Sequence, residues 1–364
     1  MLRGILEGDE KVVIHKWENN HYFRIPNPRF KNEIQEFLTK KCAQYADVDD
    51  KKNGGLEQFP AYESIVGNVY KNIARRVYDE KATNERTVWL GEGEPPANPD
   101  NIFFCKNCIF NVQQGCVIPN SPLWFNTTTL AVNYNPETSQ SCKTYLKFEE
   151  RLTGGDAKKI KLLRQFSGLC LIDKTSMQKG LIIVGPSESG KTQYGLLLSG
   201  ILGRPNLFSL DSPDFSQHFG LEEAIGKKLA LLSDCRFTNN SNIQIAVERL
   251  LKLIGEDAIP HKEKYKKAKT VYLQAKVLMI MNTLVKLPDR TGALRRRFSA
   301  LNVPDSAVLS LREKIDGIAQ VMLDNEAEAI LNLWVKEIVG LMAMKNPVLC
   351  KPDDEDELLD QFTF

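Results

Sequence analysis

The sequence lacks any long hydrophobic run and any sign of a targeting peptide. Its longest apolar stretches, such as residues 181–184 and 277–281, are far shorter than the roughly 20 residues that a helix needs to cross a bilayer. The first ten residues carry charges and contain no apolar segment of the kind found in signal peptides. We therefore expect a soluble, cytoplasmic protein without membrane contact.

Internal repeats, low-complexity segments and a strong net charge are also absent. With 364 residues, of which 42% are hydrophobic and 26% charged, the chain is long enough for two globular domains. The formal net charge of +2 does not by itself indicate nucleic-acid binding, but the charges are unevenly distributed. Residues 262–297 contain eleven Lys and Arg against two acids, whereas six acids lie between Asp353 and Asp360. We expect the acidic stretch to be a solvated tail.

No second CxxC pair accompanies the one formed by Cys105 and Cys108, although the sequence contains eight cysteines. Together with Cys116 and Cys142, this pair has a spacing that could close a zinc tetrahedron. The pair lies in an apolar, strand-like stretch, which favours buried thiols instead. We therefore expect no zinc.

Hydrophobic periodicity predicts the organisation of the chain. A hairpin is predicted around Asn19-Asn20, helices over 31–45 and 63–77, and a helical stretch over 145–171 with a break at 154–156. After residue 180, buried strands alternate with amphipathic helices, which predicts an α/β fold with a parallel sheet flanked by helices. The predicted division is a smaller mixed α+β domain (1–140), a helical linker or oligomerisation segment (141–172), an α/β core (173–340) and an acidic tail (341–364).

The strongest motif is a glycine-rich loop between a predicted strand and a predicted helix. Its residues fit the pattern GxxxxGK[ST]: Gly185, Pro186, Ser187, Glu188, Ser189, Gly190, Lys191 and Thr192. Backbone N–H groups in such a loop point into one concavity, and the dipole of the following helix also favours anions. Lys191 would reach the β- and γ-phosphates and Thr192 would ligate Mg²⁺. The motif predicts a P-loop NTPase that binds ATP and Mg²⁺.

Three further groups could complete an ATPase site. Asp234 follows the apolar strand 229–232 and could hold Mg²⁺ with Thr192. Asn282 ends the strand 277–281 and could orient the attacking water, or it could simply be a turn residue. Arg295, Arg296 and Arg297 could stabilise the transition state in a neighbouring subunit, or they could be solvated or phosphate-contacting residues.

The order of these elements resembles that of superfamily 3 helicases, and most of all the helicase part of phage, plasmid and poxvirus primase–helicases. The similarity is strong between residues 180 and 300 and moderate between 100 and 180. It lies in Gly226-Lys227 and in the segments 251–257, 263–266, 276–282 and 290–298, with further similarity upstream at 110–115, 133–136, 145–146 and 166–168.

This resemblance implies an AAA+-like core that assembles into a ring, usually hexameric, and moves 3′ to 5′ along single-stranded DNA, with RNA also open. It implies that Asn282 is a sensor and that Arg296 or Arg297 is a trans-acting arginine finger. It further implies a channel hairpin whose lysines neutralise phosphates without recognising bases. These lysines are Lys262, Lys264, Lys266, Lys267 and Lys269, and Tyr265 and Tyr272 could stack on bases or pack the hairpin.

Two departures from the family keep alternatives open. Asp234 is followed by Cys235-Arg236 instead of a second acid, so the sequence does not identify the residue that activates the attacking water. Glu256 and Asp257 are candidates. Nothing before residue 100 resembles a primase acid cluster, so we expect either that priming lies on another polypeptide, a separate primase or replication initiator, or that this is the helicase half alone. A replicative helicase of a virus, phage or mobile element is the leading hypothesis. An ATP-switched DNA-binding or loading protein is the alternative, and the lysine-rich hairpin disfavours a small-molecule kinase.

Overall fold

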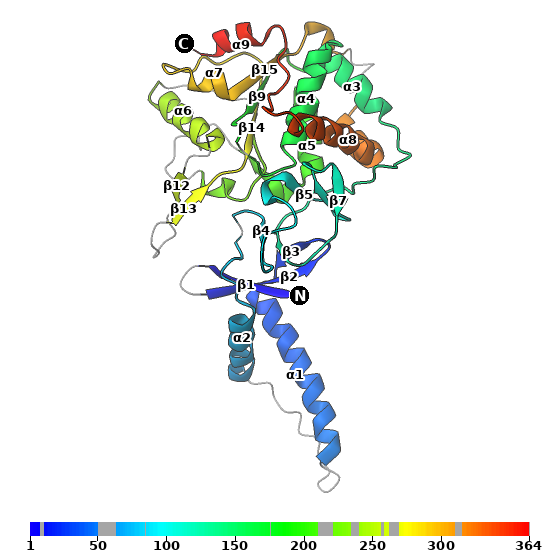
Figure 1. Ribbon diagram of the computed structural model, residues 1–364, viewed down its shortest axis with the longest axis vertical. Helices are drawn as coiled ribbons and strands as arrows, with labels where there is room; N and C mark the ends of the chain where they lie inside the picture. The colour runs from blue at the N-terminus through cyan, green and yellow to red at the C-terminus, as the bar shows by residue number, and fades with distance from the viewer. Residues whose placement is uncertain are drawn as a thin grey trace.

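The computed structural model describes residues 1–7, 11–49, 63–83, 85–174, 176–209, 221–233, 240–255, 258–261, 269–309 and 315–363. The molecule is elongated. Helices α1 (Asn27–Asp49) and α2 (Glu63–Val77) lie at one end, and helix α9 (Glu355–Phe362) lies at the other (Figure 1). Within the described residues, none of the helices combines the length and hydrophobicity that a bilayer crossing requires.

A five-stranded parallel sheet forms the centre of the molecule. Its strands, in spatial order, are β10 (Leu207–Ser209), β11 (Leu229–Ser233), β14 (Lys276–Met281), β9 (Gly180–Val184) and β15 (Phe298–Asn302). Every neighbouring pair is parallel. Strands β9 and β14 are buried along their whole length, which explains why they are continuous apolar runs in the sequence. The prediction of a parallel sheet flanked by helices is confirmed.

The order of the strands reverses at β9. After β9 the chain crosses to β10 at one edge, then returns through β11 to β14, which pairs with β9 on one side. The last strand, β15, pairs with β9 on its other side. Ligands of open parallel sheets bind beyond the carboxyl ends of the strands at such a reversal. The end of β9 is therefore where the fold predicts a ligand site.

Two layers of helices cover the two faces of this sheet. Alternate residues of β9 point to opposite faces, so Leu181 and Ile183 belong to one hydrophobic cluster while Ile182 and Val184 belong to the other. The first cluster includes α3 (Lys143–Thr153), α4 (Ala157–Leu169), α5 (Lys191–Leu202) and α8 (Ile318–Met342). The second includes α6 (Asn240–Ile254), α7 (Ala293–Arg297) and α9 (Figure 1).

The predicted break in the helical stretch after residue 145 is confirmed. Helix α3 ends at Gly154, which has a left-handed φ of 66° and donates its N–H to the carbonyls of the last turn. Asp156 then caps α4, because its side chain accepts hydrogen bonds from the N–H groups of Lys158 and Lys159.

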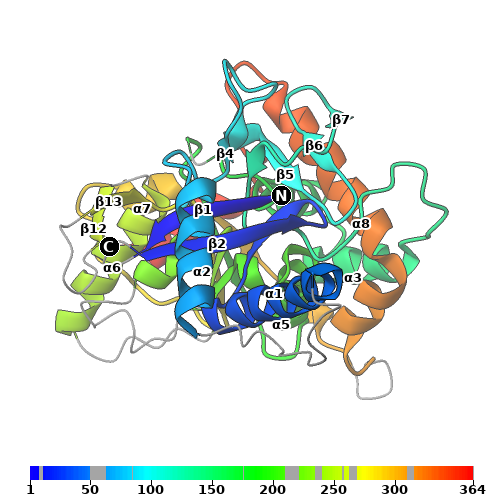
Figure 2. The same ribbon diagram turned by 90° about the horizontal axis from the view of Figure 1, so that it is seen from below.

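The N-terminal part combines a small sheet with two helices. Strands β1 (Leu2–Glu7), β2 (Lys11–Glu18) and β3 (His21–Arg24) form an antiparallel sheet. The predicted hairpin is confirmed, since Asn19 and Asn20 have φ values of 49° and 66°, as a two-residue turn of this hand requires. The predicted helices correspond to α1 and α2. They pack on each other and on the sheet in one hydrophobic cluster (Figure 2).

Short strands connect this part to the central sheet. They are β4 (Val88–Trp89), β5 (Ile102–Phe104), β6 (Ile109–Asn111), β7 (Cys116–Ile118) and β8 (Trp124–Phe125). The domain boundary near residue 141 stays a prediction. Side chains from both sides of it share a hydrophobic cluster, because Phe103, Phe110 and Leu130 lie in the cluster that contains α3 and α4.

Buried charges collect at the amino-terminal edge of the central sheet. Lys228 Nζ lies 2.5 Å from Asp173 Oδ1, and Asp173 also accepts a hydrogen bond from the Thr87 hydroxyl. Lys276, the first residue of β14, donates to the Ile172 carbonyl, and burial lowers its pKa to about 8. These bonds join the start of the central sheet to the segment that precedes β4, and they lie at the edge opposite to the predicted ligand site.

Most acids of the C-terminal segment are exposed, as expected, but the segment is a packed helix and not a free tail. Helix α9 packs against β15, and Leu358, Leu359 and Phe362 are buried in the second hydrophobic cluster. The aromatic rings of Phe298 and Phe362 meet edge to face with centroids 5.7 Å apart. Asp356, Glu357 and Asp360 are exposed on the outer side of a helix whose inner side is apolar, whereas Glu355 is buried and accepts a hydrogen bond from the Ala300 N–H.

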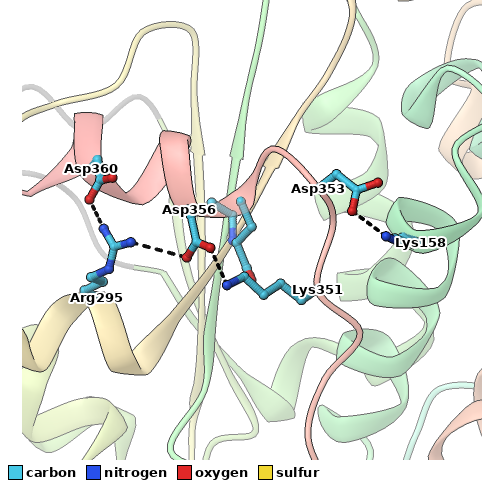
Figure 3. A network of polar contacts seen from close by, with 8 residues as sticks. Lys158, Arg295, Lys351, Asp353, Asp356 and Asp360 are labelled. Carbon is cyan, nitrogen blue, oxygen red and sulfur yellow. Dashed lines mark hydrogen bonds and ion pairs between the residues drawn. The ribbon is translucent and has the colours of Figure 1, made fainter.

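Ion pairs surround this helix on its outer side (Figure 3). Arg295 contacts Asp356 at 3.3 Å and also pairs with Asp360, while Lys351 Nζ lies 2.5 Å from Asp356. Asp353 pairs with Lys158 of α4. Exposed ion pairs contribute little free energy. The apolar contacts therefore hold α9 in place, and the ion pairs orient the side chains of Arg295 and Lys351.

We predict that Phe362→Ala lowers the free energy of unfolding by about 3–5 kcal/mol, because it removes a fully buried ring next to Phe298. Gln361→Ala, one residue earlier on the exposed side of the same helix, should change it by less than about 0.5 kcal/mol. Chemical denaturation of both variants measures the difference. Equal stability of the two variants would show that α9 is not anchored through its apolar side.

Candidate functional site

The glycine-rich loop lies at the carboxyl end of β9 and leads directly into α5. Gly190 precedes the helix with φ 98°, and Glu188 has φ 64°, a left-handed conformation that is uncommon outside glycine. A Cβ on Gly185 would lie 2.7 Å from the Val303 carbonyl oxygen, so only glycine fits at the start of the loop. The backbone is therefore held in a conformation that residues with side chains rarely adopt, as is typical of functional sites.

Lys191 is turned into the loop that precedes it. Its side chain is buried, and Nζ donates to the carbonyls of Gly185 at 2.8 Å and Pro186 at 2.5 Å and to Ser189 Oγ at 3.3 Å. Thr192, the next residue, is exposed on the first turn of α5. The loop thus combines an inward ammonium group, an accessible hydroxyl and the positive end of a helix dipole. These are the groups that bind a phosphate and its metal ion.

The register of the sheet brings the ends of three strands to this loop. Val184, the last residue of β9, pairs with Met281 of β14 on one side and with Asn302 of β15 on the other. Asn282 directly follows β14 and is exposed, so it lies beside the start of the loop. On the far side of β14, Ser233 pairs with Ile280. Asp234, the next residue, lies outside the described residues.

Helix α3 lies against the loop, which the sequence did not reveal. A Cβ on Gly190 would come within 3.1 Å of the Phe148 ring and 3.4 Å of Arg151 Nη2. The Arg151 guanidinium carbon lies 5.7 Å from the centroid of the Phe148 ring, at a distance typical of a cation–π contact. Arg151 therefore places a second positive charge at the loop, next to Lys191. No local pattern marks this arginine, because it precedes the loop by more than thirty residues.

Buried polar contacts fix the position of α3. The Glu326 carboxylate, from α8, accepts hydrogen bonds from the backbone N–H groups of Thr144 and Tyr145, each at 2.8 Å, and so caps the start of α3. The Tyr145 hydroxyl accepts from Trp334 Nε1 at 3.0 Å and donates to Glu149. Glu149 forms an ion pair with Arg164 of α4. Helices α4 and α8 thus hold the side of α3 that faces away from the loop.

The three consecutive arginines lie at the opposite edge of the sheet. They end α7, and β15 begins at Phe298, which pairs with Gly180 at the start of β9. Lys179 Nζ also donates to the Arg296 carbonyl at 2.7 Å. The length of β9, about 16 Å for five residues, separates these arginines from the loop at its other end. They are too far away to act on a phosphate in the loop of their own chain.

Each of these arginines has a different environment. Arg295 is held by the acids of α9. Arg297 Nη1 donates to the Leu251 carbonyl at 2.9 Å, in the last turn of α6, where helix carbonyls lack a partner within the helix. Arg296 is exposed, and its Nε donates to the Gly292 carbonyl at 3.2 Å. Arg296 is therefore the most accessible of the three.

The predicted channel hairpin lies mostly outside the described residues. Its two arms are β12 (Ala258–His261) and β13 (Lys269–Tyr272), which pair antiparallel. Lys269 pairs with His261 at the open end, and Tyr272 is 59% exposed, so its ring is available for contact and not packed. The other named residues of this region fall on segments that the structure does not describe: Glu256, Asp257, Lys262, Lys264, Tyr265, Lys266 and Lys267.

The four cysteines weighed as zinc ligands differ in their surroundings. Cys105 and Cys108 are buried and close the turn between β5 and β6, where the Cys105 N–H donates to the Cys108 carbonyl at 2.8 Å. A hydrogen bond that Cys105 donates to Cys108, together with burial, raises the pKa of the Cys105 thiol well above its usual value. Cys116 is exposed and Cys142 is half-buried. Within the described part of the chain, no group of three or more His, Cys, Asp or Glu side chains is placed to hold a metal ion.

Comparisons with known proteins agree with this architecture. A family of unknown function, DUF5906, matches residues 183–297, the segment from β9 to the last arginine of α7. Two apo structures of the C-terminal region of NrS-1 align with 97% of this chain and 70% of theirs. Their TM-scores are 0.56 and 0.55, at identities of 13% and 14%. This chain therefore shares the fold of that region.

A structure of JCV helicase aligns with 61% of this chain and 59% of its own length, at 15% identity. Its TM-score of 0.35 is too low to support a conclusion about the fold.

We predict that Arg151→Ala weakens the binding of a non-hydrolysable ATP analogue by about tenfold, because a hydrogen bond to a charged group contributes about 1.5–3 kcal/mol. Lys161→Ala, an exposed cation of the adjacent α4, should leave the dissociation constant unchanged, and Arg151→Lys should retain part of the affinity. Isothermal titration calorimetry measures all three. Equal affinity of Arg151→Ala and the unaltered chain would exclude a role for this residue at the loop.

Proposed function

We propose that this chain is an ATP-hydrolysing motor of the superfamily 3 helicase type that moves along single-stranded DNA. One observation carries the proposal. The GxxxxGK[ST] loop lies at the carboxyl end of β9, where the strand order reverses, with the Lys191 ammonium group inside it and Thr192 exposed at its rim. Motif and fold point to the same place independently, since the motif is local and the reversal depends on the whole sheet.

In this proposal the loop holds the triphosphate of ATP. Backbone N–H groups and the dipole of α5 bind the phosphates, and Lys191 exchanges its carbonyl partners for oxygens of the β- and γ-phosphates. Thr192 and Asp234 would hold Mg²⁺, which would neutralise negative charge on the phosphates. Asn282 orients the water that attacks the γ-phosphorus, and Arg151 adds positive charge beside Gly190.

Two features connect this site to other molecules. Arg296 is our candidate for the arginine that reaches the nucleotide of a neighbouring subunit, because it is the most exposed of the three arginines. The hairpin of β12 and β13 carries the lysines that contact the DNA strand. By resemblance, the assembly is a hexameric ring that moves 3′ to 5′, serves the replication of a virus, phage or mobile element, and works with a separate primase or initiator.

The first test is the rate of ATP hydrolysis with and without single-stranded DNA. We expect clear stimulation by DNA, which links the hairpin to the loop, and complete loss of hydrolysis in Lys191→Ala. A single-stranded RNA of the same sequence shows which nucleic acid is the track. Hydrolysis that is indifferent to both polymers would refute the motor.

The second test separates the arginines. Arg296→Ala should lower kcat by about a thousandfold, the usual contribution of an arginine finger, with little change in the binding of ATP. Arg295→Ala is the matched control, and it should keep most of the activity because α9 already holds Arg295. Mixing Arg296→Ala with Lys191→Ala should restore part of the activity, since each chain supplies the group that the other lacks. If mixing restores nothing, Arg296 does not act between subunits.

A second function is favoured by one specific observation. Asp234 is followed by Cys235-Arg236 and not by a second acid, so the residue that activates water is not evident. An ATP-switched protein that binds or loads DNA with slow hydrolysis would need no such residue. Tight ATP-dependent DNA binding together with slow, DNA-insensitive hydrolysis would identify this alternative.

A further inference from the structure

The exposed side of α2 carries positive charge and amide groups, and the one acid of the helix, Glu63, is its first residue. Five side chains at helical spacing are exposed on it: Asn68, Lys71, Asn72, Arg75 and Arg76. No Asp or Glu occurs between Ser64 and Val77. Because residues three, four and seven positions apart share one side of a helix, these groups form a continuous surface, which we call the α2 face.

The charges of the α2 face are not neutralised within the described part of the chain. No ion pair involves Lys71, Arg75 or Arg76 there, whereas Arg29 on the adjacent α1 pairs with Glu33. Lys71 and Arg75 are one turn apart, a like-charge arrangement that destabilises a helix by a few tenths of a kcal/mol. The helix is held by its other side, where Val66 and Ala74 are buried against Ile14 and Ile34.

Duplex DNA is the partner that fits this surface. We propose that the α2 face binds duplex DNA, with Lys71, Arg75 and Arg76 on phosphates and with Asn68 and Asn72 facing base edges. The major groove admits an α-helix, and asparagine amides can bond to adenine there. The α2 face has no aromatic side chain on which the bases of a single strand could stack. The apolar side of α2 packs into the N-terminal hydrophobic cluster, and Ile65 is an isolated exposed apolar side chain, so the helix presents no apolar face to a lipid surface.

The position of α2 in the molecule leaves room for a duplex. Helices α1 and α2 form the end of the molecule that is farthest from α9 (Figure 1). In both views α2 lies on the side of β12 and β13 relative to α1 (Figures 1 and 2). A duplex on α2 would thus lie at the same side as the hairpin proposed to contact the single strand. This contact is separate from the nucleotide site and adds a second nucleic-acid surface.

The test is the salt dependence of duplex binding by the full chain, without nucleotide. Each phosphate contact contributes about 0.9 to the slope of log K against log salt concentration. The variant Lys71→Ala/Arg75→Ala/Arg76→Ala should therefore lose about 2–3 from the magnitude of this slope and bind duplex at least tenfold more weakly at low salt. The charge-retaining variant Lys71→Arg/Arg75→Lys/Arg76→Lys should keep the binding. Circular dichroism verifies that both variants are folded.

A matched control removes the same total charge elsewhere. The variant Arg29→Ala/Lys40→Ala/Lys336→Ala alters exposed cations of α1 and α8 and should keep the slope. An equal loss in both triple variants, or no loss in either, would overturn the proposal. So would a loss confined to single-stranded DNA. Repeating the measurement in Lys191→Ala separates this inference from the proposed ATPase, because duplex binding by α2 should persist when hydrolysis is abolished.

Discussion

The pairing of β9 with β14 on one side and β15 on the other is the constraint on which the rest of the structure depends. This register sets Asn282 beside the start of the glycine-rich loop and sets the arginines of α7 beside the start of β9. A slip by one residue would turn Leu181 and Ile183 to the wrong face and mix the two hydrophobic clusters. The burial of these strands therefore also fixes the positions of the polar groups at their ends.

The two helical layers control the two ends of β9 separately. On one face, Glu326 and Trp334 of α8 fix α3, which in turn places Phe148 and Arg151 against the loop. On the other face, α9 holds Arg295 of α7. The two ends of β9 thus have different helical neighbours, although Lys158 of α4 also pairs with Asp353, just before α9.

The sequence predicted those features whose signals are local. The Asn19-Asn20 turn, the helix break at Gly154 and the parallel sheet were all correctly predicted, because each depends on a few neighbouring residues or on simple periodicity. The strand and helix that flank the glycine-rich loop are also present as expected. The roles assigned to Lys191, Asn282 and the arginines stay predictions, although Lys191 and Asn282 both lie at the carboxyl edge of the central sheet.

Features that depend on distant packing could not be predicted in this way. Arg151 contacts the loop only because α8 fixes the position of α3. The sequence around the loop gives no indication of this contact. The acids of the C-terminal segment dominated its composition, so the apolar residues Leu358, Leu359 and Phe362 were overlooked although their spacing is helical. A test for helical periodicity in that segment would have found α9.

The separation of Arg296 from the glycine-rich loop has a consequence for assembly. A chain that presents its arginine at one end of β9 and its loop at the other can complete the proposed site in two ways. Two chains in opposite orientations would complete both sites through one isologous, two-fold contact. Chains in the same orientation would instead form a head-to-tail, heterologous contact. Its repetition either closes into a ring or continues as a helical filament. The angle between neighbouring chains, and not the chemistry at the contact, decides between these two outcomes.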